Sequence, residues 1–311
     1  MAAPVNLTTA SQITTSIREV DFVTQFQKNW DALRTILGIM RPIRKAPGTK
    51  LISYKASVDG GLQGGTAVGE GEDIPLTKTK VEPVAYDDIE LGKWAKAVSI
   101  EAVTKYGATV AVERTDTAFR NELQKKVLTD FYTFLKTGKL VGTQKTWQRA
   151  IAIAKGAVLK RFANDNLDVT EVVGFANIID AYDYLGDKEI TVQTEFGLNY
   201  VKDFLGYKTL FLLPDAYIEQ KKVIAVPVEN IDLYYVDPAD RDYATMGSNY
   251  TVSGETNLLG YHTEYNYKNA TTTNYAIMGM KLWAEYLDGI AVVTVGTSNT
   301  EPAVAAVSEG R

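Results

Sequence analysis

The sequence contains no cysteine and only one histidine among its 311 residues. Without thiols the chain cannot form a disulfide, a thiolate metal site or a cysteine nucleophile, and this composition fits a reducing compartment. His262 is the only imidazole base, so no second histidine is available for a zinc site. Disulfide-stapled folds, thiol enzymes and histidine-rich zinc sites are therefore excluded.

Long apolar runs are also missing. No run approaches the length that spans a membrane, and the start, MAAPVNLTTASQ, lacks the basic flank and apolar core of a signal peptide. Apolar residues make up 45% and charged residues 23% of the chain, as in soluble globular proteins. We expect one large domain or two ordinary ones, with no membrane partner.

Glycine, by contrast, is concentrated in residues 59–73, DGGLQGGTAVGEGED. A Walker-type phosphate loop needs a lysine and a hydroxyl directly after its last glycine, whereas no lysine follows here until Lys78. The glycines do not open a helix either, as a dinucleotide fingerprint would require. The carboxylates of Glu70, Glu72 and Asp73 would repel a pyrophosphate. The stretch is better interpreted as a flexible loop than as a nucleotide site.

The net charge of −5 conceals a gradient along the chain. Residues 1–161 carry 24 basic and 16 acidic side chains, whereas residues 162–311 carry 9 basic and 22 acidic ones. The segment 131–161 contains seven lysines and arginines and no acid. Such polarity favours contact with nucleic acid or between oppositely charged parts of identical copies, although simple solvation of charged faces explains any single residue equally well.

Hydrophobic periodicity divides the chain into six segments. Val20–Leu37 is amphipathic with Phe22, Phe26 and Trp30 at helical spacing, but too little surrounds it to form a core of its own. We predict an N-terminal arm (1–42), an extended hairpin loop with flanking strands (43–107), a spine helix and second helix (108–164), an α/β unit (165–240), C-terminal strands (241–295) and a flexible tail (296–311).

The glycine-rich stretch lies between two strand patterns. In LISYKASV (51–58) apolar residues alternate with polar ones, as a half-buried strand requires. On the return the apolar phase flips at Gly92-Lys93, which predicts a bulge. Residues 59–73 would then form the tip of a long hairpin. Loops of this length inside a domain usually have a partner or are disordered.

Two helices follow, and then an alternation of strands and helices. The stripe from Val112 through Phe119 to Leu135 predicts a long helix over 113–136, and a second helix covers 146–164. Strands are predicted at 172–176, 189–193, 208–213, 222–228, 261–268, 274–287 and 289–295, with helices near 177–185, 196–205 and 214–220. Asp288-Gly289 is predicted to be a hairpin turn between the last two strands.

Candidates for chemistry are few. His262 has no nucleophile motif beside it and is interpreted as a surface residue. The acidic cluster Asp237, Asp240 and Asp242 lacks the glycine and the final glutamate of a calcium-binding loop. Neighbours Asp87 and Asp88 point to opposite faces of a strand and cannot easily share a substrate. We expect no catalytic residue, no metal and no cofactor.

The order of these segments resembles the major capsid proteins of tailed bacteriophages. The resemblance is sharpest over residues 69–107, where Gly69-Glu70-Gly71, Ile74-Pro75 and Val98-Ser99-Ile100-Glu101 match the turn, the Ile-Pro step and the strand end that precede the long helix. It implies an α+β phage major-capsid fold, with an N-terminal arm, an extended β-hairpin loop, a long spine helix in a peripheral domain and a mixed α/β axial domain.

The resemblance also implies a function. The chain would assemble into the pentamers and hexamers of an icosahedral head in the host cytoplasm and remain in the virion near packaged DNA. A separate scaffolding protein, a portal and a decoration protein would be its partners. Glycine's permissive backbone would let the hairpin adapt to neighbouring copies during procapsid maturation. The residues that it places in contacts between subunits are Phe22, Phe26, Trp30, Gly64, Gly65, Glu70, Ile74, Lys78 and Lys80.

Other functions stay open at this point. An encapsulin, a nanocompartment shell of the same fold, encloses cargo enzymes instead of a genome. A carboxylate-based enzyme would need a pocket within 165–236, and a phage tail or decoration module would usually be shorter and all-β. Some capsid relatives cross-link a hairpin lysine to an asparagine of a neighbour, but nothing marks Lys78, Lys80, Asn266, Asn269 or Asn274 as reactive, and we do not expect this reaction.

Overall fold

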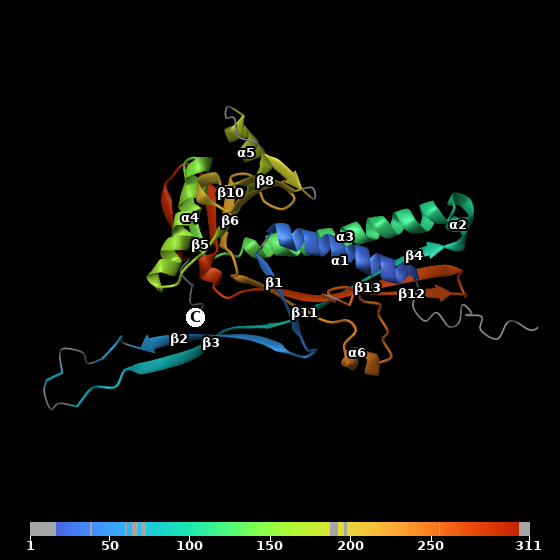
Figure 1. The fold of residues 1–311 in the computed structure, drawn as a ribbon, viewed down its shortest axis with the longest axis horizontal. Coiled ribbons are helices and arrows are strands. Elements are labelled where there is room, and N and C mark those ends of the chain that lie inside the picture. The colour runs from blue at the N-terminus through green and yellow to red at the C-terminus, as the bar shows by residue number, and fades with distance from the viewer. Residues whose placement is uncertain are drawn as a thin grey trace, which may run out of the picture.

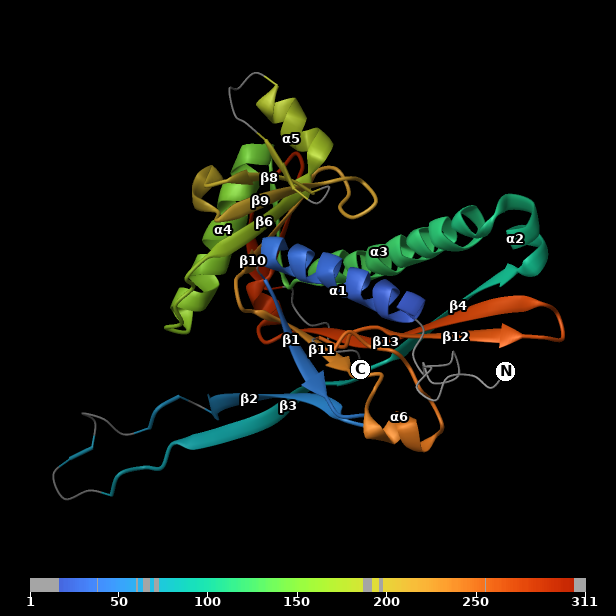
Figure 2. The same cartoon turned by 45° about the vertical axis from the view of Figure 1, so that its right-hand side comes forward.

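The computed structural model describes residues 17–37, 39–59, 61–63, 68–69, 73–186, 192–195, 198–254 and 256–304. Figures 1 and 2 show three parts: an upright axial unit around α4 (Trp147–Asn164), a long peripheral unit around α3 (Thr115–Leu135), and a hairpin that projects beyond both. Helices and mixed sheets occur together, so the predicted α+β class is confirmed.

The axial unit is built on an eight-stranded mixed sheet. Its central strands are apolar along their length because both faces are buried. Alternation sends Val173 and Phe175 into one core and Val172 and Ala176 into another, beneath α4 and α5 (Ile178–Leu185). Across the sheet the strands are β15 (Thr300–Val304), β5 (Leu140–Gln144), β14 (Ala291–Val295), β10 (Lys222–Pro227), β6 (Val172–Asn177), β9 (Thr209–Leu213), β8 (Leu198–Lys202) and β7 (Gln193–Glu195).

The peripheral unit combines a five-stranded sheet with α1 (Ile17–Leu37) and α3. Its longest strand pairs antiparallel with three others, and α1 contacts both that sheet and α3. A short helix, α2 (Ile100–Tyr106), links the sheet to a π-helical segment, Thr109–Arg114, that runs into α3. The strands are β1 (Met40–Lys45), β4 (Leu91–Ser99), β11 (Ile231–Val236), β12 (Gly260–Asn266) and β13 (Thr271–Ala284).

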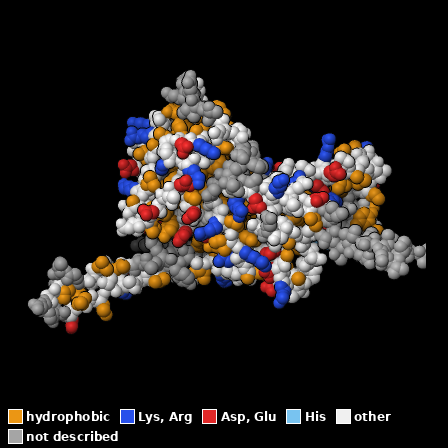
Figure 3. Space-filling view, viewed as in Figure 1, with side chains coloured by type: hydrophobic (Ala, Val, Ile, Leu, Met, Phe, Trp, Pro, Cys, Tyr) orange, Lys and Arg blue, Asp and Glu red, His pale blue; other side chains and the backbone are white. Residues whose placement is uncertain are grey.

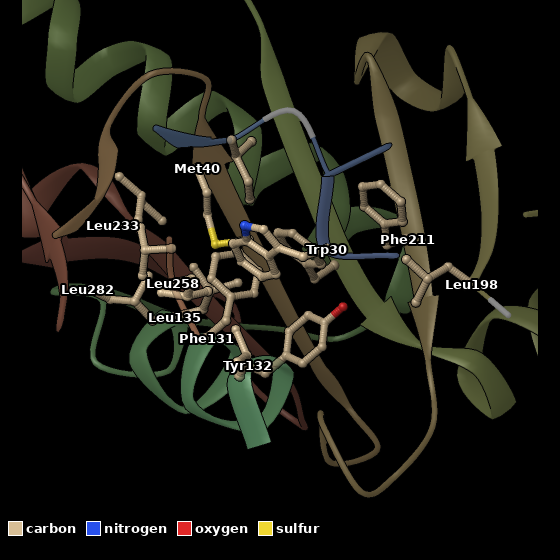
Figure 4. Packing of buried hydrophobic residues seen from close by; sticks show 14 of the residues in the cluster. Trp30, Met40, Phe131, Tyr132, Leu135, Leu198, Phe211, Leu233, Leu258 and Leu282 are labelled. Atoms are coloured by element: carbon tan, nitrogen blue, oxygen red, sulfur yellow. The ribbon is translucent and has the colours of Figure 1, made fainter. Parts of the chain in front are cut away.

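An aromatic core joins the two units. Phe131 of α3 lies edge-on to Phe175 of β6, with ring centroids 6.1 Å apart, and Phe175 stacks on Phe211 of β9 at 5.5 Å. Trp30 of α1 and Tyr132 of α3 belong to the same cluster (Figure 4), and all five side chains are buried. The ends of α1 and α3 are therefore fixed against the axial sheet.

The hairpin consists of β2 (Lys50–Asp59) and β3 (Lys78–Asp88), and within the described part of the chain these two strands pair only with each other. A register shift lies between Ser53 and Tyr54. Both figures show the two strands extending away from the units, so the predicted extended hairpin is present. Its return strand, however, is 78–88, because the strand that follows it, β4, pairs with β13 in the peripheral sheet.

The two predicted helices are confirmed. The spine helix covers 115–135 and ends just before Gly138, and its buried residues include Leu123, Val127, Phe131 and Leu135 at the expected spacing. The second helix is α4, whose N-cap Thr146 accepts a hydrogen bond from the backbone N–H of Arg149. This helix packs on the axial sheet, whereas the segment predicted over 108–164 grouped it with the spine helix in the peripheral domain.

Other local predictions were wrong. The helix expected near 196–205 is largely strand β8, in which Leu198 and Tyr200 face the aromatic core at strand spacing. The helix near 214–220 is a turn in which the backbone N–H groups of Tyr217 and Ile218 both donate to the carbonyl of Pro214. The strand at 189–193 falls mostly outside the described residues.

Two predicted turns also differ. Asp288-Gly289 lies in a short 3-10 helix (Leu287–Gly289) that connects different sheets, since β13 is peripheral and β14 is axial. The bulge at Gly92-Lys93 is absent from the β4–β13 register, which runs without a shift. Gly92 instead accommodates Trp94, whose ring would lie 2.2 Å from a Cβ at position 92.

The tail is partly ordered as a strand. Residues 300–304 form β15, which pairs with β5 at the edge of the axial sheet. The backbone N–H of Lys145 also donates to Asn299 Oδ1 at 3.1 Å. The prediction of a flexible tail over 296–311 is therefore corrected for residues 300–304.

The burial of α1 predicts a large effect of a mutation in its apolar stripe. Phe26 is 1% exposed in the core, so Phe26→Ala is expected to lower the free energy of unfolding by about 3–5 kcal/mol. The control Val20→Ala alters a side chain on the same helix that is 43% exposed, and should change it by less than about 0.5 kcal/mol. Urea unfolding of the unassembled chain measures both, and equal effects would contradict the packing of α1.

Candidate assembly surfaces

The projecting hairpin leaves apolar side chains in water. Leu62 is 87% exposed, Ile74 75% and Leu76 93%, while residues closer to the base of the hairpin are less exposed. Figure 3 shows hydrophobic side chains along this projection, at the lower left. The set, named here the hairpin surface, comprises Ile52, Val58, Leu62, Ile74, Leu76 and Val81.

Three of the residues predicted for subunit contacts lie on this hairpin. Ile74 precedes β3, and Lys78 and Lys80 are the first and third residues of that strand. Lys78 Nζ is 3.2 Å from Asp59 Oδ2, and this ion pair across the two strand ends is exposed. Gly64, Gly65 and Glu70, which were also predicted, lie outside the described residues. Contact of these hairpin residues with a neighbouring subunit thus stays a prediction. The exposure of Ile74 is compatible with it.

The three aromatic residues of the arm lie elsewhere than predicted. Phe22, Phe26 and Trp30 are 3%, 1% and 2% exposed. Phe22 stacks on Tyr261 of β12, with ring centroids 4.1 Å apart. The helical stripe was identified correctly, but it packs within its own chain, so these side chains are not exposed to a neighbouring copy in this conformation.

Two further apolar surfaces escaped the sequence reasoning. At the outer end of the peripheral unit, α2, the π-helical segment and the β12–β13 tip expose Ile100, Tyr106, Val110, Tyr265 and Tyr267. On the axial unit, Ile179 and Tyr182 occupy one face of α5, and Leu205 lies in a nearby loop at positive φ. The spacing of Ile179 and Tyr182 on a short helix was the available signal, but it does not reveal which face is covered.

Three of the seven basic residues in the stretch 131–161 form ion pairs within the chain. Lys136 pairs with Glu219 at 3.0 Å and Arg161 with Asp288 at 2.7 Å, and Lys160 lies 3.7 Å from Glu301. Hydrogen bonds from Lys136 and Lys222 lower the pKa of Glu219 to about 2. The charge gradient along the sequence is thus partly neutralised by folding, and does not by itself require nucleic acid or a neighbouring copy.

The acidic cluster after β11 holds an arginine. Arg44 of β1 contacts Asp237 at 3.3 Å and Asp240 at 3.0 Å, and Asp240 is the N-cap of α6 (Arg241–Thr245).

His262 lies on β12 with its Nδ1 4.0 Å from Glu19. Within the described ranges no three His, Asp or Glu side chains are grouped as a metal site would require, and no helix is long and apolar enough to cross a membrane.

A half-buried ionic cluster joins α1, α3 and β4. Arg18 donates to both carboxylate oxygens of Asp116, at 2.6 and 2.8 Å, and Lys96 donates to the same carboxylate. Burial opposes the charge of Asp116, but the hydrogen bonds from Arg18 and Lys96 outweigh it and lower the pKa of this carboxyl. For Lys96 burial dominates and lowers the pKa of its ammonium. Asp116 therefore remains ionised and connects three elements.

Comparison with solved structures identifies the architecture. The capsid structure of the cyanophage P-SCSP1u aligns over 94% of this chain and 94% of its own, with a TM-score of 0.53 and 10% identity. The mature capsid of bacteriophage PhiM1 aligns over 83% of this chain and 85% of its own, with a TM-score of 0.52 and 8% identity. The holo-SrpI encapsulin complex from Synechococcus elongatus PCC 7942 covers 92% and 94%, with a TM-score of 0.51 and 12% identity.

The chain has the phage major-capsid fold. Comparison of the sequence with protein families and with curated proteins finds no match. The predicted fold is confirmed by the similarity of the structures, because sequence identities near 10% would not by themselves reveal a common fold. In this major-capsid fold the β2–β3 hairpin is the extended loop, α3 is the spine helix and the eight-stranded sheet is the axial domain.

The ionic cluster predicts an acid-dependent loss of stability. Asp116→Asn removes one partner of a half-buried pair and should lower the free energy of unfolding by about 2–4 kcal/mol at pH 7. Because the folded-state pKa of Asp116 is lowered, its contribution is complete above about pH 4 and is lost as the pH falls further. The difference between the two proteins in urea unfolding should therefore shrink toward pH 2–3, by the same linkage.

Asp130→Asn is the matched control for this measurement. Asp130 lies on the same helix and contacts Lys126, but both side chains are more exposed than Asp116. Its substitution should change the free energy of unfolding by less than about 0.5 kcal/mol. A loss of equal size for both variants would show that Asp116 is an ordinary surface charge.

Proposed function

We propose that this chain is the structural subunit of an icosahedral shell, a phage major capsid protein whose pentamers and hexamers enclose packaged double-stranded DNA. The fold supports this proposal, and the observation that carries it is the projecting hairpin with its exposed apolar residues. Surfaces of this kind mark interaction sites in soluble proteins.

The hairpin needs a partner for physical reasons. An isolated two-stranded sheet is marginally stable in water, and β2 and β3 pair with no third strand among the described residues. Burying one leucine-sized side chain contributes about 1.5–3 kcal/mol, so a neighbouring copy that covers the hairpin surface would stabilise both partners. Many such contacts, repeated around a shell, would hold it together without a very stable monomer.

The remaining parts of the proposal concern partners and place. A scaffolding protein, a portal and decoration proteins would act with the shell, which would assemble in the host cytoplasm and persist in the virion. Gly64, Gly65, Glu70, Ile74, Lys78 and Lys80 would lie in the hairpin contact between copies. We also propose a structural role without catalysis.

An encapsulin-type nanocompartment is the alternative, because the encapsulin structure reaches a TM-score of 0.51, close to the values for the phage capsids. The two shells differ in content. Particles that co-purify with an enzyme would support the encapsulin, whereas empty particles or particles formed with a co-expressed scaffold would support the capsid.

Mutation of the hairpin tests the shell function. Leu76 is 93% exposed, and Leu76→Asp would place a charge where a neighbour is expected, which should lower the yield of particles at least about tenfold. Particles are counted by negative-stain electron microscopy and light scattering, with scaffold co-expressed if the chain alone stays monomeric. The control Leu167→Asp adds the same charge to a residue that is 38% exposed outside the hairpin. Normal assembly of Leu76→Asp would refute the hairpin contact, and a wild-type chain that stays monomeric with scaffold would refute the shell.

A further inference from the structure

The spine helix does not begin as an α-helix. Residues Thr109–Arg114 are π-helical, and α3 starts directly afterwards at Thr115. π-Helical turns are rare and occur frequently at functional sites. The segment is also poorly packed, since Ala111 is its one buried residue, and the adjoining α2 has none. Burial therefore contributes little to holding residues 100–114 in this conformation.

Polar contacts instead converge on the junction between the π-helical segment and α3. Lys96 Nζ of β4 donates to Thr115 Oγ1 at 2.7 Å and also to Asp116. The Thr115 hydroxyl lies 2.8 Å from the carbonyl of Ala111, inside the π-helical segment. Arg18 of α1 binds Asp116 through two N–H groups. Two elements distant in sequence thus contact the first two residues after the segment.

We propose that Arg18, Lys96, Thr115 and Asp116 form a clamp that fixes the π-helical conformation of residues 109–114, and that opening the clamp lets this segment relax to an α-helix. An α-helix has fewer residues per turn, so relaxation rotates the residues before Thr115 about the helix axis. Gly107, at φ 79°, lies just before the segment and can absorb the change, because glycine tolerates a wide range of backbone angles.

The clamp links α1 to an exposed surface at the outer end of the peripheral unit. Val110 is 44% exposed within the π-helical segment, beside the exposed Ile100 and Tyr106 of α2. Rotation would change the direction in which Val110 points and so alter this apolar surface. Asp116 is faced by Arg18 from α1, Lys96 from β4, Arg120 from its own helix and Tyr261 from β12, and Glu19 of α1 lies near both Arg18 and Tyr261. This inference does not depend on the proposed shell function.

Hydrogen–deuterium exchange of the full chain tests the clamp. In Asp116→Asn, amide exchange across 108–114 should rise about tenfold, since hydrogen bonds to a charged group are lost at the junction. At labelling times too short for global unfolding, exchange across 123–135 should stay unchanged, because those residues are held by the aromatic core. The control Asp130→Asn should leave both regions unchanged. A uniform rise over the whole chain, or no rise at 108–114, would overturn the proposal.

A second measurement distinguishes rotation from simple fraying. Because the chain has no cysteine, Val110→Cys gives a single attachment point for a spin label. Opening the clamp should shift the distance from this label to a second one introduced by Leu159→Cys on α4, while the label keeps the restricted mobility of a helix. If Asp116→Asn does not fold, Thr115→Ala opens the same junction and leaves the ion pair intact. An unchanged distance, or a fully mobile label, would contradict the α-helical relaxation.

Discussion

The aromatic core between the spine helix and the axial sheet is the contact on which the arrangement of this molecule depends. Phe131 and Tyr132 enter it from α3, Phe175 and Phe211 from the sheet, and Trp30 from α1. Among the described residues, the peripheral and axial sheets have no strand in common. The relative orientation of the two units is therefore set where these rings meet. Ring pairs of this kind contribute through area and through edge-to-face geometry, which makes the junction both stable and directional.

Because the core lies at this junction, elements far from it depend on other contacts. The outer end of the spine helix depends on the charges around Asp116, and α2 contributes no buried residue. The β2–β3 hairpin lies farthest out and exposes Leu62 and Leu76 almost fully. Burial therefore decreases from the junction toward α2 and toward the hairpin, and the hairpin surface proposed for assembly lies where the chain's own core no longer reaches.

Much of the fold could be predicted because its main elements carry strong periodicity. The spine helix and the buried strands of the axial sheet follow directly from their apolar spacing. What periodicity cannot give is the identity of the covering partner. Phe22, Phe26 and Trp30 were correctly placed on one face of a helix, but only the tertiary structure shows that Tyr261 and the core of the same chain cover that face. For the same reason the sequence predicted a hairpin between β13 and β14, although β14 pairs with β5 and β10 in the other sheet.

Charge illustrates this limit most clearly. Read along the chain, a basic first half and an acidic second half suggest contact between different molecules, yet Arg41, Arg44 and Arg161 each pair with an aspartate of the second half. Sequence separation hides these pairs, since each joins residues more than a hundred positions apart. Folding thereby uses part of the gradient internally, and the exposed apolar surfaces of the described residues are the features on which the proposed contact with another copy of the chain rests. A shell built from such copies would be held chiefly by burial of apolar area, with charge setting the geometry inside each subunit.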